Sequence, residues 1–243
     1  MRNLQPNNAI IPILRLGPEN EFIELLGTGF FAGSRPVVVT AKHVFLDNPL
    51  GEGENYGFAN ERSIEEQTLG IISQYLQCPN YDIAVFNATS CPGAVPLSFA
   101  KKNFPTNLDI LTYEFSSTYK ETEGDGITIV HFTPYTHKGN ILRHYISNYP
   151  EHIPTPVFDT SFPALQGASG APVLCATDFS VVGMLLANHE RHLIPAQTVE
   201  LKGKDGTLEE KTSYFLPTGK ALEASVIIEY LDQIKAEPTV LEK

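Results

Sequence analysis

Val37-Val-Val-Thr-Ala-Lys-His43 carries a run of β-branched residues into a small residue, a lysine and a histidine. β-branched residues are enriched in strands, and four in a row without polar alternation favour a buried strand. Gly33-Ser-Arg-Pro36 stands immediately before this run and supplies a turn. The stretch therefore predicts a short buried strand that delivers His43 at its end on a rigid support.

Strand-like runs of the same kind occur on both sides of this stretch. They cover Phe22–Leu26, Gly29–Ala32, Leu69–Tyr75, Asp82–Phe86, Ile110–Phe115, Ile127–Phe132, Asn140–Ile146, Ala171–Leu174 and Val181–Ala187. Many short strands separated by turns, without helices between them, are typical of a barrel or sandwich. We expect an all-β fold.

One segment has a helical pattern. In Lys220–Ile234 the apolar residues Leu222, Val226, Tyr230 and Ile234 repeat at every fourth position, and Thr218 is placed to cap the helix. We expect this C-terminal helix to pack on a barrel, although a partner-binding helix has the same pattern.

Two other segments organise the chain. The strand-like halves Ile194–Leu201 and Lys211–Leu216 flank the polar turn Lys202–Gly206, which predicts a hairpin insertion at 194–216. Pro92–Thr106 contains three prolines and few periodic apolar positions, so we interpret it as a linker. The expected units are residues 1–100 and residues 101–243, the second including the helix.

Composition excludes several function classes. The chain has 243 residues, 42% of them hydrophobic, with a net charge of −11 and no basic run, so nucleic acid is not an expected partner. No apolar run approaches the ~20 residues of a spanning helix. The three cysteines, an odd number, favour free thiols over a bridge between Cys78 and Cys91. We expect a soluble, cytoplasmic protein without membrane contact, unless a leader has been removed.

Gly167-Ala-Ser-Gly-Ala-Pro172 is the first candidate for chemistry. A serine hydroxyl is a poor nucleophile unless a base takes its proton and donors hold the oxyanion that forms. Glycines on both sides of Ser169 permit a tight turn in which the amides of Gly167 and Ser169 can point to one place. By itself the motif also fits an ordinary small-residue turn.

His43 and Asp82 are the candidates for base and orienting acid. Asp82 enters the apolar run Asp82–Phe86, and a carboxylate there is costly to bury without partners. A hydrogen bond to His43 would satisfy the carboxylate and fix the imidazole tautomer. Taken singly, a backbone-bonded histidine and a turn aspartate are the commoner outcomes; Asp47, before Asn48-Pro49, has the pattern of a turn residue.

Four blocks together resemble the trypsin-like serine peptidases. They are Gly27-Thr-Gly-Phe30, Val39-Thr-Ala-Lys-His43, Asp82-Ile-Ala-Val85 and Gly167-Ala-Ser-Gly-Ala-Pro172, in the family order His, Asp, Ser. Within the family the chain is most similar to short prokaryotic members related to Deg/HtrA proteases, without a PDZ domain.

The resemblance implies two packed six-stranded antiparallel β-barrels with an active site between them. Ser169 would be the nucleophile, His43 the general base and acid, and Asp82 the orienting carboxylate, with Gly167 and Ser169 as the oxyanion hole. A polypeptide substrate would add a strand along 185–188. No cofactor or metal is implied.

The resemblance also bears on the substrate-binding residues, Pro163, Leu185, Leu186, Ala187 and Asn188. Pro163 stands where trypsin carries the acid that selects basic residues, so that specificity is not supported. Leu185 or Leu186 stands where staphylococcal glutamyl endopeptidases carry a histidine, so acidic specificity is not supported either. We expect a pocket for apolar or small side chains.

Other readings remain. An α/β-hydrolase would require Gly-x-Ser-x-Gly on a strand-to-helix elbow and the order Ser, Asp, His; Gly167-Ala-Ser-Gly-Ala lacks that spacing, and no helix pattern follows it. His189-Glu-Arg-His192 lacks the spacing of a zinc-protease helix, and His131, His137, His144 and His152 are interpreted as polar positions. The main rival is an inactive member of the fold that binds peptides or a protein partner.

Overall fold

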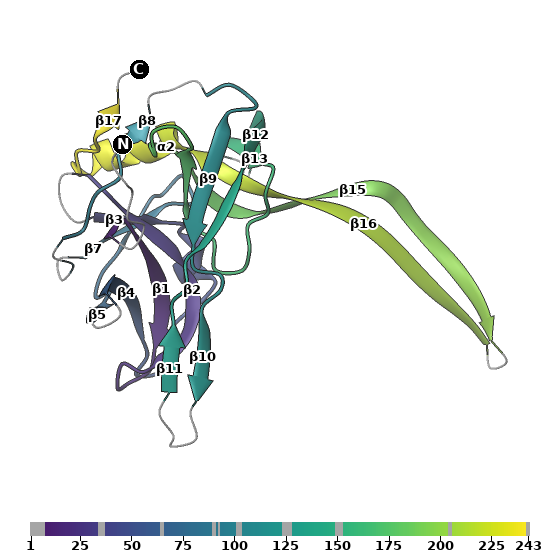
Figure 1. Cartoon of the computed structure of the whole chain (residues 1–243), viewed down its shortest axis with the longest axis horizontal. Coiled ribbons are helices and arrows are strands. Elements are labelled where there is room, and N and C mark those ends of the chain that lie inside the picture. Colours follow the sequence, from purple (N-terminus) through teal and green to yellow (C-terminus); the bar gives the residue numbers. More distant parts are fainter. Residues whose placement is uncertain are drawn as a thin grey trace.

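The computed structural model describes residues 8–33, 37–63, 66–88, 91, 93–100, 104–122, 128–148, 153–203 and 206–241. It is an all-β molecule with a helix near its C-terminal end, as the sequence predicts (Figure 1). Among the described residues, no helix is long and apolar enough to cross a membrane.

The first half is a curled seven-stranded sheet in the order β5-β4-β1-β2-β3-β7-β6. Its strands are β1 (Ile10–Leu16), β2 (Phe22–Ala32), β3 (Val37–Thr40), β4 (Asn55–Ser63), β5 (Glu66–Ile71), β6 (Leu76–Gln77) and β7 (Ala84–Asn87). A single-turn helix, α1 (His43–Leu46), follows β3. Within the described residues the edge strands β5 and β6 do not pair with each other, so this half is a partly open barrel.

The second half contains a closed six-stranded barrel, β14-β9-β12-β13-β16-β15, because β15 also pairs with β14. The six strands are β9 (Asp109–Glu114), β12 (Tyr135–Ser147), β13 (Thr155–Thr160), β14 (Pro172–Cys175), β15 (Val181–Gly203) and β16 (Gly206–Glu223). The short strands β8 (Phe99–Ala100) and β17 (Val240–Leu241) extend its sheet, and β10 (Tyr119–Thr122) and β11 (Thr128–His131) form a separate hairpin.

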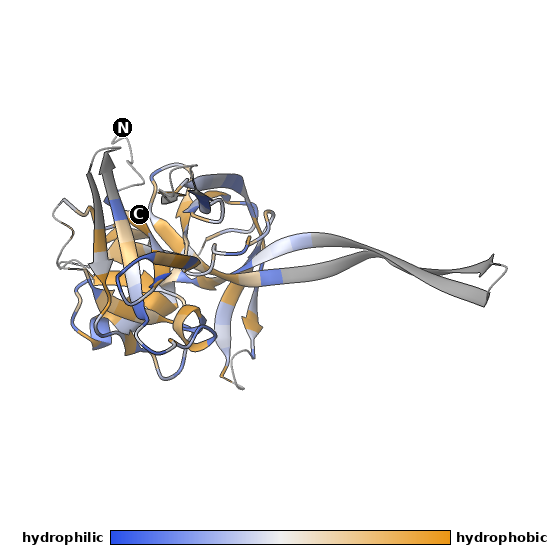
Figure 2. Ribbon diagram, turned by 90° about the horizontal axis from the view of Figure 1, so that it is seen from below, coloured by the Kyte–Doolittle hydropathy of each residue, from blue (hydrophilic) through white to orange (hydrophobic). Residues whose placement is uncertain are grey.

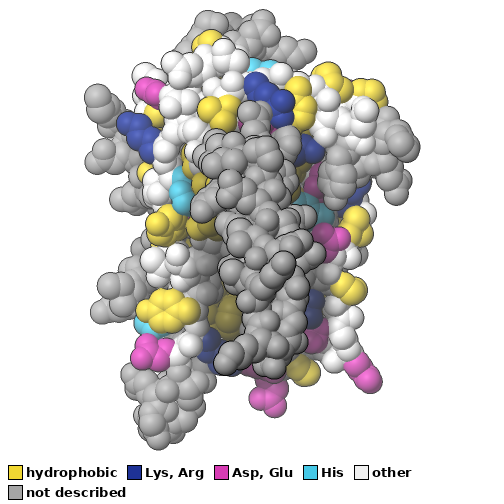
Figure 3. All heavy atoms as spheres, turned by 90° about the vertical axis from the view of Figure 1, so that its right-hand side faces the viewer, with side chains coloured by type: hydrophobic (Ala, Val, Ile, Leu, Met, Phe, Trp, Pro, Cys, Tyr) yellow, Lys and Arg dark blue, Asp and Glu magenta, His cyan; other side chains and the backbone are white. Residues whose placement is uncertain are grey.

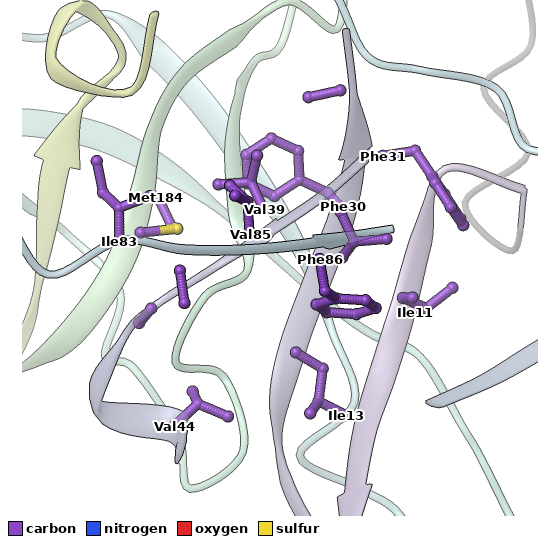
Figure 4. Packing of buried hydrophobic residues seen from close by; sticks show 14 of the residues in the cluster. Ile11, Ile13, Phe30, Phe31, Val39, Val44, Ile83, Val85, Phe86 and Met184 are labelled. Atoms are coloured by element: carbon purple, nitrogen blue, oxygen red, sulfur yellow. The ribbon is translucent and has the colours of Figure 1, made fainter. Parts of the chain in front are cut away.

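The two halves share one core. The larger cluster of buried apolar residues holds Phe30, Val39 and Phe86 from the first sheet and Met184 and Leu174 from the second. Figure 4 shows Met184 of β15 among side chains of the first sheet. Hydrophobic segments concentrate in the strands of the body (Figure 2). Because burial of such side chains supplies most of the stabilisation, the shared core fixes the two sheets against each other.

The predicted helix starts too early. The structure has α2 at Ala224–Gln233, and Lys220, Ala221 and Leu222 belong to β16. Thr218 is therefore not a helix cap, and it pairs with His189 of β15. The pairing of Phe158 with Ala221 and of Asp159 with Lys220 closes the barrel at this point, which outweighs the local helical pattern.

The hairpin insertion is confirmed, because β15 and β16 pair from Gly183 with Glu223 out to Gly203 with Gly206. The linker interpretation of Pro92–Thr106 is wrong in part, since Phe99 pairs with Val181 of β15 and Val240 of β17. Cys78, Cys91 and Cys175 are buried free thiols, as expected.

Candidate active site

His43 and Asp82 are brought together by the register of β3 and β7. Thr40 at the end of β3 pairs with Ala84 at the start of β7, so the residues just beyond each pair lie close. The carboxylate of Asp82, only 4% exposed, accepts a hydrogen bond from the backbone N–H of His43 at 2.9 Å. Its second oxygen lies 2.7 Å from His43 Nδ1. Asp82 therefore holds the imidazole at two points and leaves Nε2 for other partners.

This pairing shifts both pKa values. Burial alone would lower the pKa of His43, but the hydrogen bond and charge of Asp82, with the more distant charge of Asp47, raise it above its ordinary value. Burial would raise the pKa of Asp82, but His43, assisted by Lys42, keeps that pKa below its usual range. The pair is thus built to hold a carboxylate beside an imidazolium.

Ser169 lies in the loop between β13 and β14, which is tied to both halves of the molecule. Its carbonyl accepts a hydrogen bond from the Thr28 N–H at 2.9 Å, and the Gly170 N–H donates to the Leu185 carbonyl at 2.8 Å. The Ser169 hydroxyl donates to the Leu186 carbonyl at 3.1 Å and makes no hydrogen bond to His43 in the part of the chain described.

The backbone around Ser169 requires glycine. Gly167 and Gly170 have φ values of +89° and +86°, which L side chains rarely adopt. A Cβ at Gly170 would lie 2.2 Å from the Thr28 carbonyl oxygen, so the close approach of two backbone segments also excludes a side chain. The amides of Gly167 and Ser169, the two expected oxyanion donors, donate to no acceptor among the described residues.

One cavity of about 460 Å³ contains all three candidate side chains. Its walls are formed by His43, Asp47, Asp82, Ser169, Leu186, Ala187, Asn188 and Lys220. Asp47, which the sequence placed in a turn, is the C-cap of α1 and also faces this cavity.

Lys220 is the wall residue that sequence reasoning missed. Its ammonium donates to Ser147 Oγ at 2.7 Å, and burial lowers its pKa although Asp159 and Asp82 partly oppose that effect. Lys220 could have been singled out from the sequence because it is the one charged residue in the stretch Gly219–Leu222.

The expected substrate-binding residues separate into two groups. Leu186, Ala187 and Asn188 line the cavity, and the last two are exposed. Pro163 is half-buried and Leu185 is fully buried in the core of the second barrel, and neither lines this cavity. The Asn188 side-chain oxygen accepts the Ala164 N–H at 2.6 Å, which fixes the loop before Ser169 to β15.

The remaining described histidines are each close to a carboxylate. His144 Nδ1 lies 2.9 Å from Glu223, His137 lies 3.4 Å from Glu114, and His131 lies 3.6 Å from Glu121. Over the described residues, no group of three or more potential ligands is arranged to hold a metal ion. The side chains of His152, His189 and His192 fall outside the described residues.

A partly open barrel and a closed barrel that share a core, with this loop between them, define the chymotrypsin-like fold. A sequence model of the trypsin-like peptidase domain matches residues 27–184, well over half of the chain. The chain belongs to this family. A search of curated proteins found no match.

Solved structures of proteases have the same fold. The Rv3671c protease of M. tuberculosis in its active form is 19% identical with a TM-score of 0.56, over 97% of this chain and 84% of that one. The MamO protease domain of Magnetospirillum magneticum is 13% identical with a TM-score of 0.57, over 93% and 96%. The HtrA-type protease AlgW, solved with a decapeptide, is 13% identical with a TM-score of 0.60, over 94% and 65%.

Proposed function

We propose that this protein is a serine endopeptidase that uses Ser169, His43 and Asp82 as a catalytic triad. The observation that carries the proposal is the buried Asp82 carboxylate, 2.7 Å from His43 Nδ1, in the same cavity as Ser169. This arrangement leaves the other ring nitrogen for a nucleophile and stabilises the imidazolium that forms when the imidazole takes a proton.

The reaction would proceed through an acyl-enzyme. His43 Nε2 removes the proton of the Ser169 hydroxyl as Oγ bonds to the substrate carbonyl carbon, and the amides of Gly167 and Ser169 stabilise the oxyanion. The C–N bond then breaks, and His43 gives its proton to the leaving amine. Water, activated by the same imidazole, hydrolyses the ester and regenerates Ser169.

One adjustment of the resting site is needed. The Ser169 hydroxyl donates to the Leu186 carbonyl, so a rotation about its Cα–Cβ bond must redirect it toward His43. Catalytic hydrogen bonds commonly tighten only when substrate is bound. The backbone on both sides of the hydroxyl is held in place by the hydrogen bonds to Thr28 and Leu185.

The substrate would be an extended polypeptide. It would add as a strand beside 186–188, where Ala187 and Asn188 are exposed along the cavity. The HtrA-type protease solved with a decapeptide supports a peptide as the class of ligand. Leu186 and Ala187 favour apolar or small substrate side chains.

The resting serine favours one second candidate, an inactive module that binds peptides, because its hydroxyl is not directed to a base. A fluorophosphonate probe separates the two. Labelling of the wild type, with none of Ser169→Ala, supports the peptidase; no labelling at any pH from 5 to 9 supports the binding module. A peptide-library cleavage profile with Ser169→Ala as the control then reads the specificity.

A further inference from the structure

Lys220 places a positive charge in the wall of the catalytic cavity. It lines the same cavity as Ser169 and His43, and its side chain is half-buried rather than extended into solvent. The ammonium donates to Ser147 Oγ at 2.7 Å, so the end of this flexible side chain is held against the wall. A lysine ammonium is a compact point charge, and one that is partly shielded from water acts strongly on charges that enter the cavity.

The neighbour of Lys220 in the sheet places it beside the path of the substrate. On β15, Ala187 pairs with Lys220, and directly paired residues have their side chains on the same face of a sheet. Ala187 is exposed along the cavity, and its methyl group is too short to cover the lysine next to it. Lys220 therefore reaches from β16 into the space that a substrate side chain above Ala187 would occupy.

The proposed substrate strand would present alternate side chains to this face. The Ser169 hydroxyl lies 3.1 Å from the Leu186 carbonyl, so the first residue before the scissile bond would lie beside Leu186. The second residue would then lie beside Ala187, because β15 pairs antiparallel with its neighbours and an added strand is expected to do the same. Since side chains alternate along a strand, the second and fourth residues share the face of Ala187.

We propose that Lys220 selects an acidic side chain at the second or the fourth substrate residue before the scissile bond. The inference rests on the proposed peptidase function and adds a charge preference to the apolar or small side chains that Leu186 and Ala187 favour. The ammonium donates to the substrate carboxylate, and such charge-assisted hydrogen bonds are stronger than those between neutral groups.

The carboxylates of the protein near Lys220 already bind other donors. Asp159, which pairs with Lys220, lies 2.6 Å from Arg143 and accepts the Tyr145 hydroxyl at 3.0 Å. Asp82 is bonded through both oxygens to the triad histidine. Burial lowers the pKa of Lys220 in spite of the charges of these two acids. Their attraction thus does not offset the lost hydration of the ammonium, and a substrate carboxylate would be a favourable additional partner.

The surface around the cavity does not supply this preference. On the face from which β15 and β16 leave the body, the basic and acidic side chains that the structure describes are interspersed with hydrophobic ones (Figure 3). The whole chain has a net charge of −11 and repels acidic peptides at long range. A preference for a carboxylate at one substrate position therefore requires a local cation, and Lys220 supplies one in the cavity wall.

The test compares internally quenched peptides that differ only in one carboxylate. A peptide that the protein cleaves receives Glu or Gln, and in a second pair Asp or Asn, at each of the four positions before the scissile bond. We expect kcat/KM to be about 5- to 20-fold higher for the acid than for its amide at the second or the fourth position. At the first and third positions, whose side chains point to the other face, the acid should gain less than about two-fold.

Three variants separate the charge of Lys220 from its bulk. Lys220→Met keeps an aliphatic stem and should bring the ratio of acid to amide to about one, whereas Lys220→Arg keeps the charge and should retain most of the ratio. Lys42→Met is the matched control, because Lys42 adjoins His43 but donates to the Cys78 carbonyl at 3.0 Å and does not line the cavity. It should leave the ratio unchanged. Each ratio compares two peptides on one protein, so a change in the common catalytic rate cancels.

Salt gives a second readout. Raising NaCl from about 0.05 to 0.5 M should reduce the wild-type ratio at least two-fold, because ions screen a partly exposed pair, and should not change the ratio of Lys220→Met.

Three results would each overturn the inference. They are a preference that Lys220→Met keeps, a preference confined to the first or third position, and ratios near one at every position on a wild type that cleaves peptides and labels with the fluorophosphonate probe. A wild type that neither labels nor cleaves would instead overturn the proposed function, and this inference with it.

Discussion

The Thr28 hydroxyl donates a 2.8 Å hydrogen bond to the carbonyl of Gly167. Thr28 belongs to β2 of the first sheet, and Gly167 belongs to the loop that carries Ser169. Thr28 is fully buried, and its hydroxyl also accepts the N–H of Phe115 at 3.3 Å. One side chain therefore holds the peptide group between Gly167 and Ala168, which lies between the peptide groups that carry the two amides of the candidate oxyanion hole.

Thr28→Val should lower kcat/KM about ten-fold, or ~1.4 kcal/mol of transition-state stabilisation, by freeing the loop before Ser169. It should also reduce the free energy of unfolding by about 1–3 kcal/mol, because the Gly167 carbonyl and the Phe115 amide lose a buried partner.

Thr40→Val is the matched control. The Thr40 hydroxyl is also buried and donates to the Thr28 carbonyl at 2.8 Å, but it has no bond to Gly167. Urea unfolding and peptide kinetics on both variants show whether Thr28 affects activity through the Gly167 loop or only through stability. Equal losses of activity in the two would show that Thr28 acts through stability alone.

Gly167→Ala should reduce turnover by about 10²–10³, the loss typical of one oxyanion donor. The φ of +89° is strained for alanine, and the new Cβ would lie 2.5 Å from Leu25 Cδ2. Adding Leu25→Ala removes the contact but not the strain, so stopped-assay kinetics on the double variant should show little recovery. Full recovery would mean that crowding, not backbone conformation, caused the loss.

Asp82→Asn should lower turnover by something on the order of 10⁴ and leave the fold intact. The amide oxygen can still accept the His43 N–H, but the imidazolium loses its counter-charge. Asp47→Asn serves as the comparison, since Asp47 is exposed and acts on His43 only through its charge. Circular dichroism establishes folding; near-normal activity in Asp82→Asn would remove Asp82 from the triad.

The pH dependence of kcat/KM should follow His43. Only the neutral imidazole accepts the serine proton, and Asp82 raises the pKa of His43 above its ordinary value of 6.5. Activity should therefore rise with pH, with a midpoint above 6.5, and the midpoint should fall in Asp82→Asn. A rate that stays constant from pH 5 to 9 contradicts the role of His43.

The shifted pKa values of His43 and Asp82 also make the stability of the folded protein depend on pH. Because the folded pKa of His43 is raised, its stabilising contribution is present below pH 6.5 and lost as pH rises through the folded value. Because the folded pKa of Asp82 is lowered, its contribution is present above pH 3.8 and lost as pH falls through the folded value. The difference in melting temperature between wild type and His43→Ala should thus be largest between about pH 4 and 6.5. A difference that grows steadily toward alkaline pH would contradict this linkage.

The candidate site could be predicted because each of its three residues has a local signal. His43 ends a valine-rich strand, Asp82 enters an apolar run, and Ser169 stands between glycines. The three residues come together only through pairing between strands that are distant in sequence. That arrangement was predicted from the resemblance to a family and not from local patterns. The partly open first sheet could not be anticipated, since closure depends on strand edges that no local pattern describes.

Strand β13, which the sequence pattern did not predict, shows why some elements of the fold could not be anticipated. It contains Pro156 and the buried acid Asp159, both of which suggest a loop. Asp159 is tolerated because Arg143 lies 2.6 Å from it and the Tyr145 hydroxyl donates to it at 3.0 Å. Both partners come from β12, so the strand becomes recognisable only when its neighbour is known.

The ring of strands in the second barrel has a consequence for how the chain acquires its shape during synthesis. The first sheet uses residues up to Asn87 and can assemble while translation continues. The second barrel includes β16, which ends at Glu223, so the barrel cannot close until that residue has left the ribosome. Ser169 is therefore translated well before the barrel that surrounds it can close, so the candidate site is completed only at a late stage of synthesis.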